Sequence, residues 1–204
     1  MDKKFDLVEV LDLSNNKFSG RIPSNLQTLK GFRILNGSKL SDNSLHDDLG
    51  IVIKGYEYMI TYGLATNIIF DLSNNNIIVE IPRSIGSLSR LRLLNLSRNE
   101  LTGQIPKSLS KIHTLEELDL SGNNLNGSIP QELTALTMLA SLDLSCNRIC
   151  GKIPKGTQFD TFNVISFQGN PCLCGSPLQP CSKSRVQPRS TTISRDRGWL
   201  SHVN

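Results

Sequence analysis

Five cysteines are the residues of this chain with the most evident chemical potential, and all of them lie between residues 146 and 181. Thiols gathered in this way form disulfides in an oxidising compartment or bind a metal ion as thiolates. No histidine lies near them, and the C-x-C spacing of Cys172 and Cys174 is poor for zinc. We therefore expect disulfides and no metal site. Because five is an odd number, at least one thiol stays unpaired within the chain.

Groups suited to acid–base or nucleophilic catalysis are not gathered in the same manner. His46, His113 and His202 are scattered, and the chain contains no phosphate-binding glycine motif and no kinase signature. Four aspartates recur at one position of a repeated phrase: Asp12, Asp71, Asp119 and Asp143. A solvated repeat face explains these acids better than catalysis. We expect no enzymatic activity and no cofactor.

The phrase that carries the aspartates is written five times, as "LDLSGNNLNGSIP" from Leu118 and as close variants from Leu11, Phe70, Leu94 and Leu142. Its asparagines recur every 24 residues through the last four copies, which is the length and pattern of a leucine-rich repeat. The sequence therefore predicts a leucine-rich-repeat solenoid of the α/β horseshoe type. Short parallel strands would form the concave side, and 3₁₀ or short α turns would form the convex side.

Each residue type in the phrase has an expected structural role. Leucines such as Leu118 and Leu120 point into the solenoid, while Glu117 and Asp119 point outward, because side chains alternate along a strand. An Asn amide can satisfy buried turn groups, which predicts a structural ladder: Asn16, Asn75, Asn99, Asn123 and Asn147. The apolar residue two positions later should face inward again: Phe18, Ile77, Leu101, Leu125 and Ile149. Glycines should permit a second bend: Gly20, Gly103, Gly127 and Gly151.

One gap between copies is too long, since Asn16 and Asn75 are 59 residues apart. We divide the chain into one repeat (5–30), an irregular island (31–67), four repeats (68–154), a cysteine cap (155–181) and a basic tail (182–204). The island holds all three tyrosines, and "IVIKGYEYMITY" has the near-alternating pattern of a strand. It is either a spacer that bulges from the solenoid or a partner contact, and long irregular loops with aromatic residues favour the second.

The cap must cover the last apolar face of the stack. Phe159, Phe162 and Phe167 provide the bulk for this role. Cys150 and Cys172 are 22 residues apart, close to one repeat, so stacking could bring them together. We predict that these two residues pair and that Cys146 stays free.

Charge and hydropathy exclude several classes of protein. The formal net charge is +4, and residues 182–204 account for all of it, so the body of the chain has no basic surface for nucleic acid. No apolar run reaches the roughly 18–20 residues of a membrane helix. The first ten residues, "MDKKFDLVEV", have no apolar segment of the signal-peptide type.

Three features together resemble the C-terminal ectodomain of plant receptor-like proteins, which are cell-surface leucine-rich-repeat receptors without a kinase domain. They are the spelling "LSxNxLxGxIP", the island with Lys54 and Gly55, and the stretch "GTQFDTFNVISFQGNPCLCGSPLQPC", which cover about residues 5–181. The resemblance implies a Cys174–Cys181 disulfide, a position on the extracellular side of the plasma membrane, a protein or peptide ligand, and a receptor-kinase co-receptor. Family members also have a signal peptide, further repeats and a membrane helix, so we expect this chain to be a fragment or a short product.

Three N-x-[ST] sequons, at Asn36, Asn95 and Asn126, fit a secreted origin, although chance produces such triplets in a Ser- and Asn-rich repeat. Asn95 occupies an outward strand position, where a glycan would obstruct the concave face.

We therefore predict a recognition module that signals through a kinase co-receptor in defence or development. Its expected surface joins the island to the concave column: Lys54, Gly55, Tyr56, Tyr58, Arg92, Glu117, Asp119 and Asp143. In a competing interpretation Lys54 and Gly55 only shape the return to the repeats, and the tyrosines pack on the solenoid. Two other functions stay open: a soluble enzyme inhibitor similar to the polygalacturonase-inhibiting proteins, and a non-functional fragment.

Overall fold

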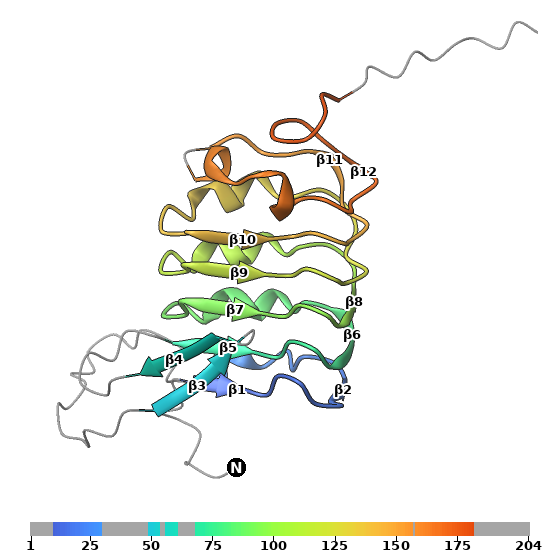
Figure 1. Ribbon diagram of the computed structural model, residues 1–204. Coiled ribbons are helices and arrows are strands. Elements are labelled where there is room, and N and C mark those ends of the chain that lie inside the picture. The colour runs from blue at the N-terminus through green and yellow to red at the C-terminus, as the bar shows by residue number, and fades with distance from the viewer. Residues whose placement is uncertain (1–9, 30–48, 54–55, 61–67, 157, 182–204) are drawn as a thin grey trace, which may run out of the picture.

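The repeats stack into a single solenoid whose rungs follow one another in sequence order (Figure 1). The computed structural model describes residues 10–29, 49–53, 56–60, 68–156 and 158–181. A five-stranded parallel sheet forms one side of the solenoid: β1 (Val10–Asp12), β5 (Ile69–Asp71), β7 (Leu93–Asn95), β9 (Glu117–Asp119) and β10 (Ser141–Asp143). We call the outer surface of this sheet the concave face. The predicted leucine-rich-repeat solenoid is confirmed.

The sheet has a one-to-one register because each rung repeats the same strand. Leu94 pairs with Leu118, and Leu118 pairs with Leu142, so equivalent leucines lie side by side. These residues and the next leucine of each strand phrase are buried in one continuous core. No single repeat could bury its apolar residues alone, so the stack is the smallest stable unit.

A second set of short strands follows the turn of each rung. β2 (Ser19–Gly20), β6 (Asn76–Glu80) and β8 (Glu100–Thr102) form a parallel sheet on the flank of the solenoid. β11 (Cys150–Lys152) pairs in parallel with β12 (Cys172–Cys174). In the repeats, these strands lie between the asparagine of the phrase and the "IP" pair, and they hold the flank of adjacent rungs in register.

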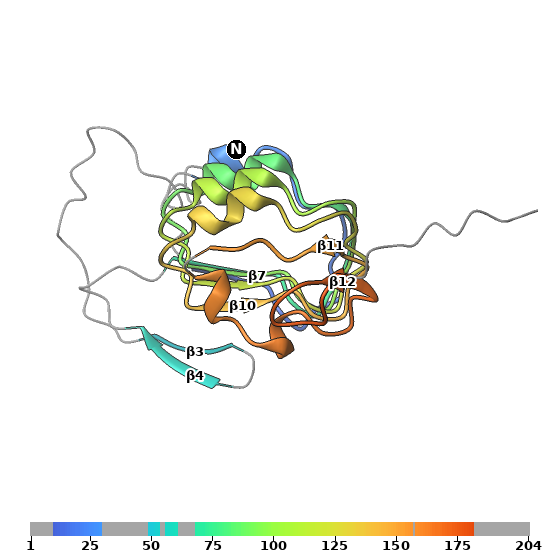
Figure 2. The same ribbon diagram turned by 90° about the horizontal axis from the view of Figure 1, so that it is seen from above.

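Short 3₁₀ helices line the side opposite the five-stranded sheet, as Figure 2 shows from above. Their bounds are η2 (Leu26–Thr28), η4 (Arg83–Ser87), η5 (Lys107–Lys111) and η6 (Gln131–Ala135). η4, η5 and η6 each begin directly after a proline, Pro82, Pro106 or Pro130, in extended conformation. Proline suits this position because its fixed φ leads into the turn and its missing N–H is not needed there.

The asparagines form a ladder that joins each rung to the one before it. The amide nitrogen of Asn123 donates to the carbonyls of Leu96 (3.0 Å) and Leu120 (3.1 Å). Its side-chain oxygen accepts the backbone N–H of Leu101 at 3.0 Å. The same pattern occurs at three other repeats: Asn75, Asn99 and Asn147. Asn16 differs, because it is exposed and donates only to carbonyls of its own repeat, those of Leu13 and Ser14.

Two left-handed backbone positions recur in each rung. The residue before the ladder asparagine has a positive φ, as at Asn74 and Arg98, and the second bend has a positive φ at Gly103 and Gly127. Val79 occupies the second-bend position in its repeat with φ +74°. A β-branched residue is strained in this conformation.

The expected inward position of Phe18 is wrong, since this side chain is 48% exposed on the outer rung of the described stack.

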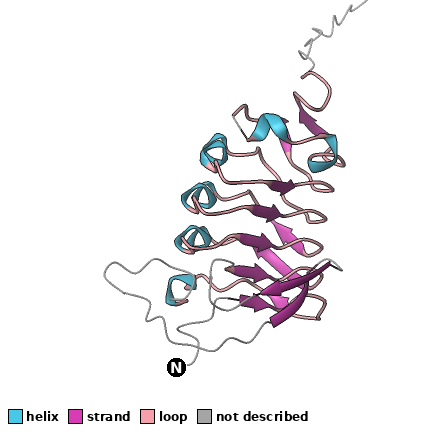
Figure 3. Cartoon of the chain, turned by 60° about the vertical axis from the view of Figure 1, so that its left-hand side comes forward, coloured by secondary structure: helices cyan, strands magenta, loops and turns pink. Residues whose placement is uncertain are grey.

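The island adds no strand to the five-stranded sheet between the first two repeats, because β1 pairs directly with β5. Within it, β3 (Leu49–Ile53) and β4 (Tyr56–Ile60) form an antiparallel hairpin in which Ile51 is paired with Tyr58. Figure 3 shows the hairpin on the strand side of the solenoid, away from the 3₁₀ helices. Part of the island is therefore an ordered strand pair, as the alternating pattern predicts.

The cap closes the stack with a turn that resembles another repeat. η7 (Phe159–Thr161) and η8 (Val164–Ser166) replace the strand, and Asn170 takes the ladder position. Phe159, Phe162 and Phe167 are all buried, and the first two pack edge to face with ring centroids 5.8 Å apart. Aromatic rings in this geometry fill a large volume at the end of the core.

Candidate functional site

The outward side chains of the five-stranded sheet form two rows along the concave face. The register places Val10, Ile69, Leu93, Glu117 and Ser141 in one row, which we call the entry row. It places Asp12, Asp71, Asn95, Asp119 and Asp143 in another, which we call the acid row.

The acid row holds the chain in its turn after each strand. The carboxylate of Asp71 accepts the backbone N–H of Ser73 at 2.7 Å, and that of Asp119 accepts the N–H of Ser121 at 2.9 Å. Asp12 and Asp143 do the same two residues ahead. This is the local turn that Asp and Asn side chains favour. The recurrence of aspartate in the phrase has a structural reason, and it needs no acid–base role.

Asp71 and Asn95 form the most buried part of this row, with no exposed surface on either residue. The amide nitrogen of Asn95 donates to the second carboxylate oxygen of Asp71 at 2.9 Å. Burial raises the pKa of Asp71, the hydrogen bonds from Ser73 and Asn95 act against this rise, and the nearby charge of Asp12 adds to it. A carboxyl group removed from water without a cation resists ionisation.

The expected glycan at Asn95 is incompatible with this arrangement. Its amide nitrogen is bound to Asp71, and its oxygen accepts from the backbone and hydroxyl of Ser97 at 3.1 and 2.7 Å. A buried amide with both ends engaged offers no site for a sugar. Asn126 is exposed on the flank, so that sequon is accessible, and Asn36 lies outside the described residues.

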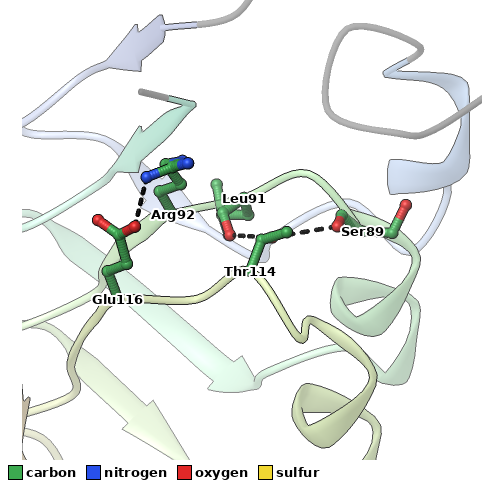
Figure 4. A network of polar contacts seen from close by, with 5 residues as sticks. All are labelled: Ser89, Leu91, Arg92, Thr114 and Glu116. Atoms are coloured by element: carbon green, nitrogen blue, oxygen red, sulfur yellow. Dashed lines mark hydrogen bonds and ion pairs between the residues drawn. The ribbon is translucent and has the colours of Figure 1, made fainter. Parts of the chain in front are cut away.

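Arg92 and Glu116, which flank the entry row, form an ion pair between adjacent rungs (Figure 4). Both side chains are partly exposed, so the pair contributes little to stability. Beside it, the hydroxyl of Thr114 donates to the carbonyls of Leu91 (2.8 Å) and Ser89 (3.1 Å). Arg92, a basic residue of the predicted contact surface, is therefore paired with an acid of the next rung.

The remaining predicted contact residues differ in exposure. Glu117 and Asp143 are half-buried, and Ser141 beside them is exposed. Asp119 is only 3% exposed, so its place in an exposed contact column is wrong. Its side chain instead supports the turn after β9, and only Glu117 and Asp143 keep accessible surface among the predicted acids.

The island contributes the hairpin backbone to the same side of the solenoid. Tyr56 begins β4 and Tyr58 lies at its centre. Lys54, Gly55 and Tyr62 lie outside the described residues. What sequence reasoning missed is the apolar half of the entry row, Val10, Ile69 and Leu93, which could have been found by aligning the strands of all five copies.

The cysteines of the cap form two disulfides. Cys150 is bonded to Cys172, with Cα atoms 4.6 Å apart, and these residues are register partners in β11 and β12. Cys174 is bonded to Cys181, with Cα atoms 5.0 Å apart. Cys146 is free and exposed. The bonds join the last repeat to the cap and close the cap on itself.

Among the described residues, no group of His, Cys, Asp or Glu side chains could hold a metal ion. No helix in the described part of the chain combines the length and the apolar character needed to cross a membrane.

Comparison with known sequences agrees with the repeat architecture. One family model described as Leucine rich repeat matches residues 68–125, and another matches residues 7–29 and 138–159. Receptor-like protein 9DC3 of Solanum pimpinellifolium is 57% identical over 183 residues, which cover 85% of this chain and 21% of that protein. Receptor-like protein 33 of Arabidopsis thaliana is 55% identical over 186 residues, which cover 87% and 21%.

Solved structures also agree with the repeat architecture. The BIR3–SERK2 complex from Arabidopsis thaliana contains a similar chain with a TM-score of 0.62 and 30% identity, covering 88% of this chain and 77% of that one. The ectodomain of GASSHO1/SCHENGEN3 from the same plant, in complex with CASPARIAN STRIP INTEGRITY FACTOR 2, has a TM-score of 0.55 and 28% identity, covering 84% and 19%. The chain spans about a fifth of the length of the receptor-like proteins it matches. By its repeats, its cap and these similarities, the chain belongs to the plant leucine-rich-repeat receptor-like proteins.

Proposed function

We propose that this chain is a recognition module of a plant cell-surface receptor, which binds a protein or peptide ligand and pairs with a receptor-kinase co-receptor. The observation that carries the proposal is the concave face itself. Five strands in exact register present a continuous surface, and the island hairpin lies on the same side. Rigid scaffolds that carry an inserted segment beside a regular surface are a common way to build a binding site.

Two of the similar structures contain a bound partner, which supports this proposal. One is a complex with SERK2, and another contains the bound factor CASPARIAN STRIP INTEGRITY FACTOR 2. By analogy, we place this chain on the extracellular side of the plasma membrane, in a defence or developmental pathway. The contact surface would combine β4, with Tyr56 and Tyr58, and the accessible concave residues Glu117, Ser141 and Asp143. Aromatic anchors supply contact area at low entropic cost, while the acids set orientation and association rate.

A chimera tests this function. Residues 5–181 replace the matching segment of receptor-like protein 9DC3, and co-precipitation with a SERK2 ectodomain is measured in leaf tissue. We expect the chimera to associate, and Tyr56→Ala, Tyr58→Ala and Glu117→Arg to reduce the association about tenfold, equivalent to about 1.4 kcal/mol. The control is Lys107→Ala on the opposite side, where Lys107 pairs only with Glu132 at 2.8 Å. Equal association by all four variants, at equal surface expression, contradicts the proposed contact surface.

A further inference from the structure

The entry row changes from apolar to polar along the sheet. Val10, Ile69 and Leu93 occupy the positions that Glu117 and Ser141 occupy in the later rungs. All five side chains point away from the solenoid core, because the next residue of each strand, such as Leu94, points into it. Three adjacent rungs therefore present apolar side chains on a surface where the next two present polar ones.

These apolar side chains are buried although they face outward. Ile69 is 4% exposed and Leu93 is 8% exposed, and with half-buried Val10 they form an apolar cluster separate from the solenoid core. We call this cluster the concave apolar patch. Glu117 lies between two strands of the sheet, as Ile69 and Leu93 do, yet it is half-buried. The sheet alone thus does not account for the burial, and a cover over the first rungs is required.

The acid row is also most covered beside the patch. Asp71 and Asn95 have no exposed surface and Asp119 is 3% exposed, whereas Asp12 and Asp143, at the two edges of the sheet, are half-exposed. The buried part of this row therefore includes the rungs of Ile69 and Leu93 and extends to Asp119. Burial also raises the pKa of Asp71, which agrees with a side chain screened from water.

The hairpin of β3 and β4 lies on the sheet side of the molecule, at its N-terminal rungs. Figure 1 shows it across β1 and β5, and Figure 2 shows it on the sheet side, opposite the 3₁₀ helices. Its strands read "LGIVI" and "YEYMI", which are rich in apolar residues. A two-stranded hairpin is marginally stable in water by itself, so its order needs a packing surface.

We propose that the concave apolar patch of Val10, Ile69 and Leu93 is the docking site of the island hairpin. Docking fixes the hairpin as a wall at one end of the concave face and removes the first three rungs from contact with a partner. The accessible surface then runs from Glu117 through Ser141 to the cap. The hairpin and the open rungs together define where an extended partner segment fits.

Hydrogen exchange of the complete chain, followed by mass spectrometry, tests the docking. The variant Leu93→Glu places on the third rung the residue that the fourth rung already has at this position, Glu117, so the solenoid should tolerate it. We expect amide protection in residues 49–60 to fall at least tenfold, while residues 117–144 keep their protection. Val10→Glu, at the half-buried end of the patch, should have the same effect to a smaller degree. Met138→Glu is the matched control, since Met138 is an exposed apolar residue outside the sheet.

Two outcomes would overturn the proposal. One is equal protection of residues 49–60 in the wild type, Leu93→Glu, Val10→Glu and the control. The other is exchange of these amides at unprotected rates in the wild type. The measurement involves no ligand or co-receptor, so its result is independent of whether the chain acts as a receptor module.

Discussion

The side-chain oxygen of Asn170 accepts a hydrogen bond from the backbone nitrogen of Ile149 at 3.0 Å. The amide nitrogen of Asn170 also donates to the carbonyls of Leu144 and Phe167, both at 2.9 Å. These are the contacts that Asn147 makes one rung earlier. The cap is therefore bound to the last repeat by the same asparagine hydrogen bonds that bind the repeats to one another.

We expect Asn170→Ala to destabilise the chain by about 3 kcal/mol, because it leaves the backbone N–H of Ile149 and the carbonyl of Phe167 without their hydrogen-bond partner and removes one of two donors to the carbonyl of Leu144. The measurement is urea unfolding followed by circular dichroism. Asn126→Ala, at an exposed position, is the control and should change the unfolding free energy by less than about 0.5 kcal/mol. A loss at Asn170 no larger than that of the control would mean that the cap does not depend on the ladder.

A substitution at Val79 is expected to stabilise the chain, whereas Asn170→Ala destabilises it. It has φ +74° where the next three repeats have glycine, and it is 42% exposed. Val79→Gly removes the left-handed strain of a β-branched residue, offset in part by the greater freedom of glycine in the unfolded chain. We expect a net gain of about 1 kcal/mol in unfolding free energy. Val79→Ala removes the branch but keeps the Cβ, so it should recover only part of this gain. A loss of stability in Val79→Gly would show that its side-chain contacts outweigh the strain.

The solenoid is predicted well from the sequence because one repeat period determines the strands, the turns and the core together. One spacing of 24 residues places the strand leucines, the ladder asparagines and the turn glycines at once. Asn170 was not predicted as a ladder residue because it follows Asn147 by 23 residues instead of 24 and precedes the buried Leu173 by three residues instead of two. The repeat period shifts where the cap begins, so only the hydrogen bonds to the backbone show that Asn170 is equivalent to the ladder asparagines.

The candidate site is predicted less completely, because burial on the concave face depends on what lies above the sheet. The alternation rule places Asp119 and Asn95 outward, and they do lie on that face. It does not tell which rungs are covered, so the rule treats buried Asn95 and half-exposed Asp143 alike. The position of an inserted segment over a regular surface is set by tertiary packing, which a local pattern does not contain.

The cysteines provide a chemical prediction. Alkylation of the folded, unreduced chain should label Cys146 alone, and non-reducing peptide mapping should recover Cys150 with Cys172 and Cys174 with Cys181. Replacing both Cys174 and Cys181 by serine should cost about 2–4 kcal/mol of stability, because the unfolded chain regains the freedom of the closed loop. Cys146→Ser is the control and should be nearly neutral. A bond between Cys146 and Cys150 would contradict the pairing.

Asp71 predicts a particular pH dependence of stability. Burial raises its pKa in the folded state above the ordinary value, so the folded chain holds this proton at pH values where the unfolded chain has released it. The free energy of unfolding contributed by this group is therefore full below the unfolded pKa, which is near 4, and falls as the pH rises through the folded pKa.

The variant Asp71→Asn cannot titrate at this position, so it isolates the effect. Its amide nitrogen would face the amide nitrogen of Asn95, where the carboxylate now accepts a hydrogen bond at 2.9 Å, and this adds a cost that does not change with pH. We expect the stability of Asp71→Asn relative to the wild type to increase from pH 4 upward and then to level off. Urea unfolding of both proteins at half-unit pH steps from 4 to 7 measures the difference, in which the titration of carboxyl groups that do not interact with Asp71 cancels. A flat difference, or one that decreases with pH, would mean that Asp71 ionises at least as readily in the folded chain as in the unfolded one, and that burial does not raise the pKa of its carboxyl group.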